Sequence, residues 1–348
     1  MAAGGPRWLL FQVHGGAPPS FHGGTLAMFS TRRFRIHHLL VLLPFLLPAV
    51  SCGPGPETEE EAAPEEPELP PEPQRIVAIG DLHGDLEAAR AALLLAHAID
   101  RSDKWIGGDL QVVQVGDILD RGDGEKEILD LFHRLQDEAA AAGGGVHLIH
   151  GNHELMNAYM DFRYVTEGGF HSFEGLADVD PTDSVLGALE PDQRPRAAAF
   201  RPGGPMARRL AEHRLAVTLG GTIFTHAGIL PVHTEMGLDS MEAKVHAWLM
   251  GEASQPEWIR GDSSPVWNRA YSGEPRVGAC DSLAMVLDRL GLERMVVGHT
   301  VQAAGITAYC GGRLWCIDVG MARHYGGRPE ILEIQGTRVK SLRWPFDL

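Results

Sequence analysis

The chain has 348 residues, of which 44% are hydrophobic and 22% charged, with 42 glycines and 23 prolines. This composition fits a globular protein of one or two domains and excludes a fibrous or wholly disordered chain. The formal net charge is −16, and residues 73–348 carry 26 basic against 38 acidic side chains, or −12. That balance argues against a nucleic-acid partner, although a small basic pocket remains compatible with it.

Residues 28–52 have the parts of a secretory signal peptide: three arginines, an apolar run over 39–50, and then Ser-Cys. Twelve apolar residues are too few to span a bilayer. The end of the run resembles a bacterial lipoprotein signal, although Ala49 stands where Leu is usual. The resemblance implies that Cys52 is lipidated and that the protein is exported to the cell envelope as a periplasm-facing lipoprotein. It leaves open a true start at Met28, and an uncleaved N-terminal anchor is the alternative.

Residues 53–74 are rich in proline and glutamate and have almost no bulky apolar side chain. Such a segment cannot bury enough apolar surface to order itself. We therefore expect a disordered, extended tether, followed by one domain over 75–348.

Three cysteines lie in that domain, at Cys280, Cys310 and Cys316. Cys310 and Cys316 flank a predicted hairpin turn. Two alternatives stay open: a cross-strand disulfide between them in an oxidising compartment, or two unpaired packing cysteines.

Strands and helices are expected to alternate from residue 75 onward. The predicted strands cover 75–80, 111–115, 146–150, 222–225, 295–297 and 314–317, and the predicted helices cover 86–99, 125–141 and 282–290. The β-α-β-α-β order of the first five elements predicts a mostly parallel sheet with right-handed crossovers. Residues 161–201 have no sustained period, so we expect a long loop or a small cap there.

Side chains that can bind metals follow these strands, at the edge where open α/β sheets hold their ligands. They are Asp81, His83, Asp117, Asp120, Asn152, His153, Glu154, His226 and His299. Carboxylate, imidazole and amide oxygen donors from separate strand ends suit two divalent cations bridged by one carboxylate. One such turn is common, but five in this order predict a dinuclear metal site.

The blocks GDLHGD (80–85), GDILDRG (116–122) and GNHELMN (151–157) stand in this order, followed by His226-Ala227-Gly228 and Gly298-His299-Thr300. Over roughly residues 75–320 the sequence resembles the calcineurin-like metallophosphoesterases. Within them it resembles the phosphoprotein phosphatase branch, and most of all the bacterial Shewanella-like protein phosphatases. The resemblance implies an α/β/β/α sandwich of mixed sheets with flanking helices. Two features depart from the family: Ala227 replaces a common glycine, and the C-terminal SAPNYC-type block of eukaryotic members is missing.

The resemblance implies a metal-binding role for six residues. Asp81 and His83 would bind the first ion, Asp117 would bridge, and the second ion would take Asn152, His226 and His299. The expected ions are Mn²⁺, with Fe or Zn as alternatives.

The resemblance also implies catalytic roles. His153 resembles the general acid that protonates the leaving oxygen, and Asp120 would orient its ring. Arg121 resembles the phosphate clamp, for which a guanidinium fork is suited. Arg269 is the expected partner arginine, with Arg163 as a second candidate. Nine other histidines, including the one at 324, match no motif and are expected to be structural or solvated.

The expected function is metal-dependent hydrolysis of phosphomonoesters, in which hydroxide activated by two metals attacks phosphorus in line. The expected substrate is a phosphorylated protein, peptide or small molecule, and the LMN and DFRY flanks favour a protein phosphatase. One alternative is a dinucleoside-tetraphosphate hydrolase, whose family shares the blocks. Another is a catalytically silent envelope-binding module, against which the complete set of ligands and His153 weighs strongly.

Overall fold

The computed structural model describes residues 75–345, which form two five-stranded mixed sheets. The first sheet has the order β10 (Arg338–Arg343), β9 (Glu330–Gln335), β1 (Ile76–Ile79), β2 (Gln111–Gln114), β3 (Gly145–Leu148). The second has the order β4 (Ala216–Leu219), β5 (Thr222–Thr225), β6 (Arg294–Val297), β8 (Leu314–Cys316), β7 (Thr307–Tyr309). The three strands β1, β2 and β3 are parallel, as predicted, whereas β9 pairs antiparallel with β1.

Alternate residues of the central strands face opposite sides, because side chains alternate along a strand. Ile76 and Ala78 of β1 pack between the sheets with Phe224 and Val296. Val77, in contrast, packs with the helices outside the first sheet. Burial on both faces explains why β1 is continuously apolar.

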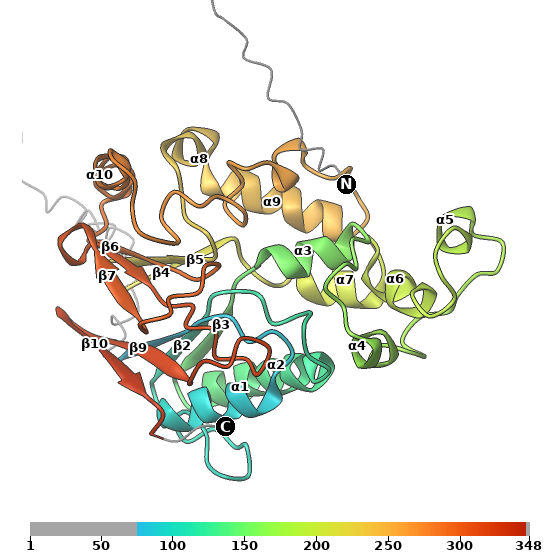
Figure 1. Cartoon of the computed structure of the whole chain (residues 1–348), viewed down its shortest axis with the longest axis horizontal. Coiled ribbons are helices and arrows are strands. Elements are labelled where there is room, and N and C mark those ends of the chain that lie inside the picture. The colour runs from blue at the N-terminus through green and yellow to red at the C-terminus, as the bar shows by residue number, and fades with distance from the viewer. Residues whose placement is uncertain (1–74, 346–348) are drawn as a thin grey trace, which may run out of the picture. The chain divides into compact units, whose positions relative to one another are not determined.

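Helices cover the outer faces of both sheets, which gives the expected α/β/β/α sandwich (Figure 1). On the side of the first sheet lie α1 (Leu86–Leu95) and α2 (Glu125–Ala141). On the other side lie α8 (Pro231–Met236), α9 (Leu238–Leu249) and α10 (Ala279–Leu290). Helix α1 ends four residues before its predicted end, because His97 takes a positive φ of 52° and Ile99 bridges to Trp105.

The stretch 161–201 is more ordered than the predicted loop. It contains α4 (Glu167–His171), α5 (Ser184–Gly187) and α6 (Arg194–Phe200), which lie to the right in Figure 1. Phe162, Leu186 and Ala197 form a small apolar cluster that holds this cap together. The remaining short helices are α3 (Asn152–Ala158), α7 (Pro205–Leu210), η1 (Glu257–Arg260) and η2 (Cys310–Gly312).

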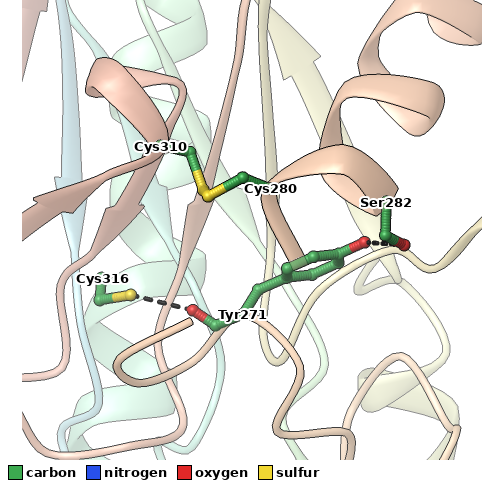
Figure 2. Close-up of a disulfide and its surroundings, with 5 residues drawn as sticks. All are labelled: Tyr271, Cys280, Ser282, Cys310 and Cys316. Carbon is green, nitrogen blue, oxygen red and sulfur yellow. Dashed lines mark hydrogen bonds between the residues drawn. A yellow bond between two sulfur atoms is a disulfide. The ribbon is translucent and has the colours of Figure 1, made fainter. Parts of the chain in front are cut away.

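The disulfide joins Cys280 to Cys310, so both sequence alternatives were wrong (Figure 2). In the antiparallel pair β7–β8, Cys316 lies opposite Thr307, whereas Cys310 lies in the turn. The two cysteines are therefore not cross-strand neighbours. Cys310 instead reaches the start of α10, and Cys316 is a buried free thiol.

The signal region, Cys52 and the tether lie outside the described residues. Within residues 75–345, no helix has both the length and the apolar character needed to cross a membrane.

Candidate active site

The predicted metal-binding side chains converge at the carboxyl ends of strands from both sheets. Two groups have ligand atoms within 4.8 Å of one another: His83, Asp117 and His153 form the first, and Asp117, His226 and His299 form the second. Asp117 belongs to both groups. Its position suits the bridging carboxylate that the sequence predicts.

Asp117 Oδ2 lies at the centre of the cluster. It is 3.8 Å from His83 Nε2, 3.8 Å from His153 Nε2 and 3.4 Å from His226 Nε2. His226 Nε2 is also 3.0 Å from Asn152 Oδ1 and 3.1 Å from His299 Nδ1.

Asp81 joins the cluster from the end of β1. Its Oδ2 is 4.0 Å from His83 Nε2, and both of its oxygens accept from the His299 backbone N–H at 3.2 Å. All six predicted ligands are therefore gathered in one place.

The tautomers of two histidines fit a metal site. His83 Nδ1 donates to the Leu119 carbonyl at 3.1 Å, and His226 Nδ1 donates to the Val115 carbonyl at 2.9 Å. A carbonyl can only accept, so these bonds leave the Nε2 lone pairs pointing toward Asp117. In the neutral rings, these lone pairs and the nearby carboxylate and amide oxygens can all bind one cation. The donor set therefore fits divalent metals.

The charges of the carboxylates lead to the same conclusion. Burial, reinforced by Asp318 and Asp117, raises the pKa of Asp81 well above its ordinary value. Burial also raises the pKa of Asp318 to about 6 and that of Glu154, in both cases with a contribution from Asp117. Burial opposes the ionisation of Asp117 itself, but the neighbouring His226 and His153 hold its pKa well below the ordinary value. Bound cations would relieve the repulsion among these groups.

Two glycines of the motifs are sterically required. A Cβ at Gly151 would lie 2.1 Å from Asp117 Oδ1, and a Cβ at Gly298 would lie 2.4 Å from Asp81 Oδ1. Any side chain there would push a carboxylate out of the cluster.

His153 and Asp120 form a hydrogen-bonded pair beside the first group. His153 Nδ1 lies 2.6 Å from Asp120 Oδ2, so its Nε2 faces the cluster. Burial lowers the pKa of His153, but Asp117 and Asp120 outweigh this effect, and the net shift is upward. The pair is nine-tenths or more buried, and the ring can hold a proton there.

A fully buried arginine from the cap supports this pair. Arg196 on α6 pairs with Glu125 at 2.5 and 2.9 Å and reaches Asp120 Oδ1 at 3.3 Å. It also donates to Asn157 Oδ1 at 2.7 Å, and Asn157 Nδ2 donates to Asp120 Oδ1 at 2.9 Å. Asp120 Oδ1, the oxygen that does not face His153, thus accepts hydrogen bonds from both Arg196 and Asn157.

Arg121 has no carboxylate partner within residues 75–345. Its guanidinium lies 4.5 Å from the Tyr164 ring and 5.3 Å from the Tyr325 ring, and Nη1 is 3.3 Å from His324 Nε2. Its buried Nε has no hydrogen-bond partner. Stacking fixes the plane of the guanidinium and leaves its charge available to an anion.

The two other candidate arginines differ in their surroundings. Arg269 Nη1 donates to Thr300 Oγ1 at 2.6 Å, and its charge helps to lower the pKa of His299, behind burial and His226. Arg269 therefore lies on the side of the second group. Arg163 is exposed and engaged by Asp161 at 2.6 and 2.8 Å, so it is not available as a clamp.

Sequence reasoning assigned no role to four residues of the site. Asp318 stands two residues after the end of β8 and directly after the predicted strand 314–317, and the pattern of an apolar strand followed by aspartate could have revealed it. Glu154 stands inside the third block and accepts four backbone N–H groups. Arg196 and His324 carry no signal in the sequence. His324 is exposed, which agrees with the prediction that it is structural or solvated, and it also contacts Arg121.

Comparison with known proteins agrees with this geometry. The family model of the calcineurin-like phosphoesterases matches residues 74–303. The chain belongs to the calcineurin-like phosphoesterase family. This phosphoesterase is therefore a phosphoester hydrolase of a family with a dinuclear metal site, as the sequence predicts, and the silent binding module is set aside.

Relatives of this phosphoesterase carry protein phosphatase names. A protein named Shewanella-like protein phosphatase 2 from Arabidopsis thaliana is 40% identical over 303 residues, which cover 77% of each chain. Shewanella-like protein phosphatase 1 from Plasmodium berghei is 29% identical, over 77% of this chain and 74% of its own. The resemblance inferred from the blocks is thus confirmed.

Solved structures share the fold. The cold-active protein-tyrosine phosphatase of a psychrophilic Shewanella species superposes with a TM-score of 0.63 at 23% identity, covering 78% of this chain and 80% of its own. This likeness confirms the sandwich of two mixed sheets.

Asp318 predicts a pH dependence for the phosphoesterase after chelation of its metals. Its pKa rises from 3.8 to about 6 on folding, so the ionised form opposes folding. Stability from this group is complete below pH 4 and is lost as the pH rises through 6. We expect the free energy of unfolding of Asp318→Asn, relative to that of the parent, to be about 2 kcal/mol larger at pH 7 than at pH 4.5.

Denaturant unfolding of both chelated proteins at the two pH values measures this gain. The parent with metals restored serves as the control, because bound cations compensate the charge. If the unfolding free energies of the variant and the parent differed by the same amount at both pH values, the pKa of Asp318 would be the same in the folded and the unfolded chain.

Proposed function

We propose that this phosphoesterase removes phosphate from phosphorylated protein or peptide side chains. The observation that carries the proposal is the unpaired guanidinium of Arg121 beside the ligand cluster and the His153–Asp120 pair. One phosphoryl group can meet all three. The relatives named as protein phosphatases support the choice of substrate.

Two divalent ions would be held by Asp81, His83, Asp117, Asn152, His226 and His299. When bound, they lower the pKa of water and neutralise charge on phosphoryl oxygens. The mixed nitrogen and oxygen donors suit Mn²⁺, Fe or Zn, and we propose Mn²⁺. Elemental analysis of the protein from its native source tests this identity, and Fe or Zn in place of Mn²⁺ would contradict it.

Arg121 and Arg269 bind the phosphoryl group from two sides. The Arg121 fork, stacked by Tyr164 and Tyr325, offers parallel N–H donors to two phosphoryl oxygens. Arg269 adds positive charge from the side of His299. Both charges favour the transition state, in which phosphoryl oxygens carry most of the negative charge.

His153 supplies the proton for the leaving group. Water joins phosphorus and gives one proton to solvent as the ester P–O bond breaks, and the departing oxygen takes the proton from His153 Nε2, which regains a proton from solvent. Asp120 holds Nδ1–H and keeps Nε2 directed at the cluster. Arg196 holds Asp120 and Glu125 in turn, so the cap positions the acid without touching substrate.

The protein is also proposed to work outside the cytoplasm, anchored by lipid on Cys52. The Cys280–Cys310 disulfide supports this proposal, because disulfides persist in oxidising compartments. We expect the native protein to enter the detergent phase and Cys52→Ser to remain in the aqueous phase or unprocessed. Mass spectrometry that finds unmodified Cys52 within an intact N-terminus would rule out the anchor.

The function and the role of His153 are tested by kcat/KM on a phosphoserine peptide, an activated aryl phosphate and a dinucleoside tetraphosphate. The parent should prefer the peptide to the dinucleotide. His153→Asn should lose about 10²–10⁴-fold on the peptide, because an alkoxide needs the proton, and much less on the aryl ester.

Arg121→Ala is the comparison, since loss of phosphate binding should weaken all substrates alike. Equal losses on peptide and aryl ester for His153→Asn would remove the acid role. Preference for the dinucleotide would replace the proposed substrate with a nucleotide.

Arg196 makes a separate prediction. Arg196→Met should cost about 3–5 kcal/mol of stability, because it leaves buried carboxylates without their cation. Where the variant folds, it should share the signature of His153→Asn: a larger kcat loss on the alkyl than on the aryl ester. Arg196→Lys keeps the charge, so its stability and its kcat should lie between those of the parent and those of Arg196→Met.

Arg163→Met is the matched control, because Arg163 lies in the same cap and pairs with Asp161 at the surface. It should change stability by less than about 1 kcal/mol and leave both esters unaffected. Equal losses on the two esters for Arg196→Lys would mean that Arg196 holds the cap and not the acid.

A further inference from the structure

A hollow of about 700 Å³ borders the active site on the side of the second group. Two of its lining residues also belong to the site. The Trp267 ring meets the His299 ring edge-on, with centroids 6.0 Å apart, and Arg269 is bonded to Thr300 next to His299. A substrate whose phosphate lies at the cluster can therefore extend into this hollow.

The charge of the hollow differs from that of the protein. Arg269 and Arg276 line it together with one acidic residue, Asp262, whereas residues 73–348 have a formal charge of −12. Within the described part of the chain, the exposed Arg276 side chain makes no hydrogen bond or ion pair. A local excess of positive charge, with one guanidinium unengaged, is complementary to a carboxylate.

Apolar side chains complete the lining. Leu230 and the half-buried Trp267 form the wall, and Val277 is fully exposed at the rim. A bulky apolar side chain placed here would bury apolar surface against these residues.

The rim segment 273–278 is fixed at both ends (Figure 2). Before it, Tyr271 is buried, its hydroxyl bonds to Ser282 at 2.9 Å, and its carbonyl accepts from the Cys316 thiol at 3.0 Å. After it, Cys280 is joined to Cys310. Anchoring at both ends reduces the ordering entropy that a ligand must overcome.

We infer that this hollow is a binding subsite for the polypeptide next to the phosphorylated residue, and that it selects an acidic and a bulky apolar side chain. The inference rests on the proposed function, because it requires a peptide substrate. Arg276 recognises the carboxylate, and Trp267, Leu230 and Val277 recognise the apolar group. Arg269 links the subsite to the phosphate.

Three phosphopeptides test the inference: one with Glu and Leu on the N-terminal side of the phosphoresidue, one with them on the C-terminal side, and one with Gly and Ala on both sides. Phenyl phosphate serves as the reference without flanks. The parent should prefer one of the Glu-Leu peptides about three- to tenfold, mainly through KM, and salt should weaken this preference.

Arg276→Glu should abolish or reverse the preference, measured as the ratio of kcat/KM on that peptide to kcat/KM on phenyl phosphate. Val277→Ser should reduce the contribution of Leu alone, measured with a Glu-Ala peptide beside the Glu-Leu peptide. Arg338→Glu is the matched control, since Arg338 is an exposed arginine on the edge strand β10 and undergoes the same change of charge. It should retain the parent's ratio.

Two results overturn the subsite and spare the proposed function: phosphopeptides hydrolysed without regard to their flanks, or a preference that Arg276→Glu leaves intact. A parent that hydrolyses phenyl phosphate but none of the phosphopeptides overturns the proposed function, and the subsite with it.

Discussion

The structure depends on keeping several acceptor groups together, out of water, around Asp117. Carboxylate, amide and imidazole acceptors lie 3.0–4.0 Å apart there, and each would gain free energy by returning to solvent. Backbone N–H groups oppose that tendency. Glu154 accepts four of them, from Asp117, Ile118, Leu119 and Gly151, and so ties the loop after β2 to the start of α3. Parallel strands that end at a common edge bring these loops together, which is why the sheet order and the site cannot be separated.

Buried negative charge is compensated in two different ways on the two sides of the cluster. Around Asp120 and Glu125 the protein supplies its own cation, Arg196, with a fork that satisfies both carboxylates. Around Asp81, Asp117 and Asp318, no arginine or lysine of residues 75–345 forms an ion pair, and burial raises the pKa of Asp318 to about 6. The first arrangement fixes the geometry of the acid. The second leaves a place that suits exchangeable cations.

The sequence predicted what depends on short segments and repeated motifs. Residues 125–141 form the expected helix, and all six predicted ligands converge, because each follows a strand of the sheets at a short, fixed distance. It did not predict β9, whose antiparallel pairing with β1 joins residues over 250 positions apart, a contact set by tertiary packing. Arg196 was missed for a related reason. It stands among prolines and other arginines in a stretch without periodicity, and only the folded cap shows that it is buried.

The free thiol of Cys316 bears on how the chain keeps its covalent connectivity. Burial raises its pKa to about 12, and its Sγ–H is directed to the Tyr271 carbonyl. Exchange between thiols and disulfides requires a thiolate, so the folded protein holds its third cysteine in the unreactive form near the Cys280–Cys310 bond. Among the three cysteines of residues 75–345, oxidation after folding therefore gives a single pairing, and that pairing resists exchange with Cys316 even in mildly alkaline surroundings.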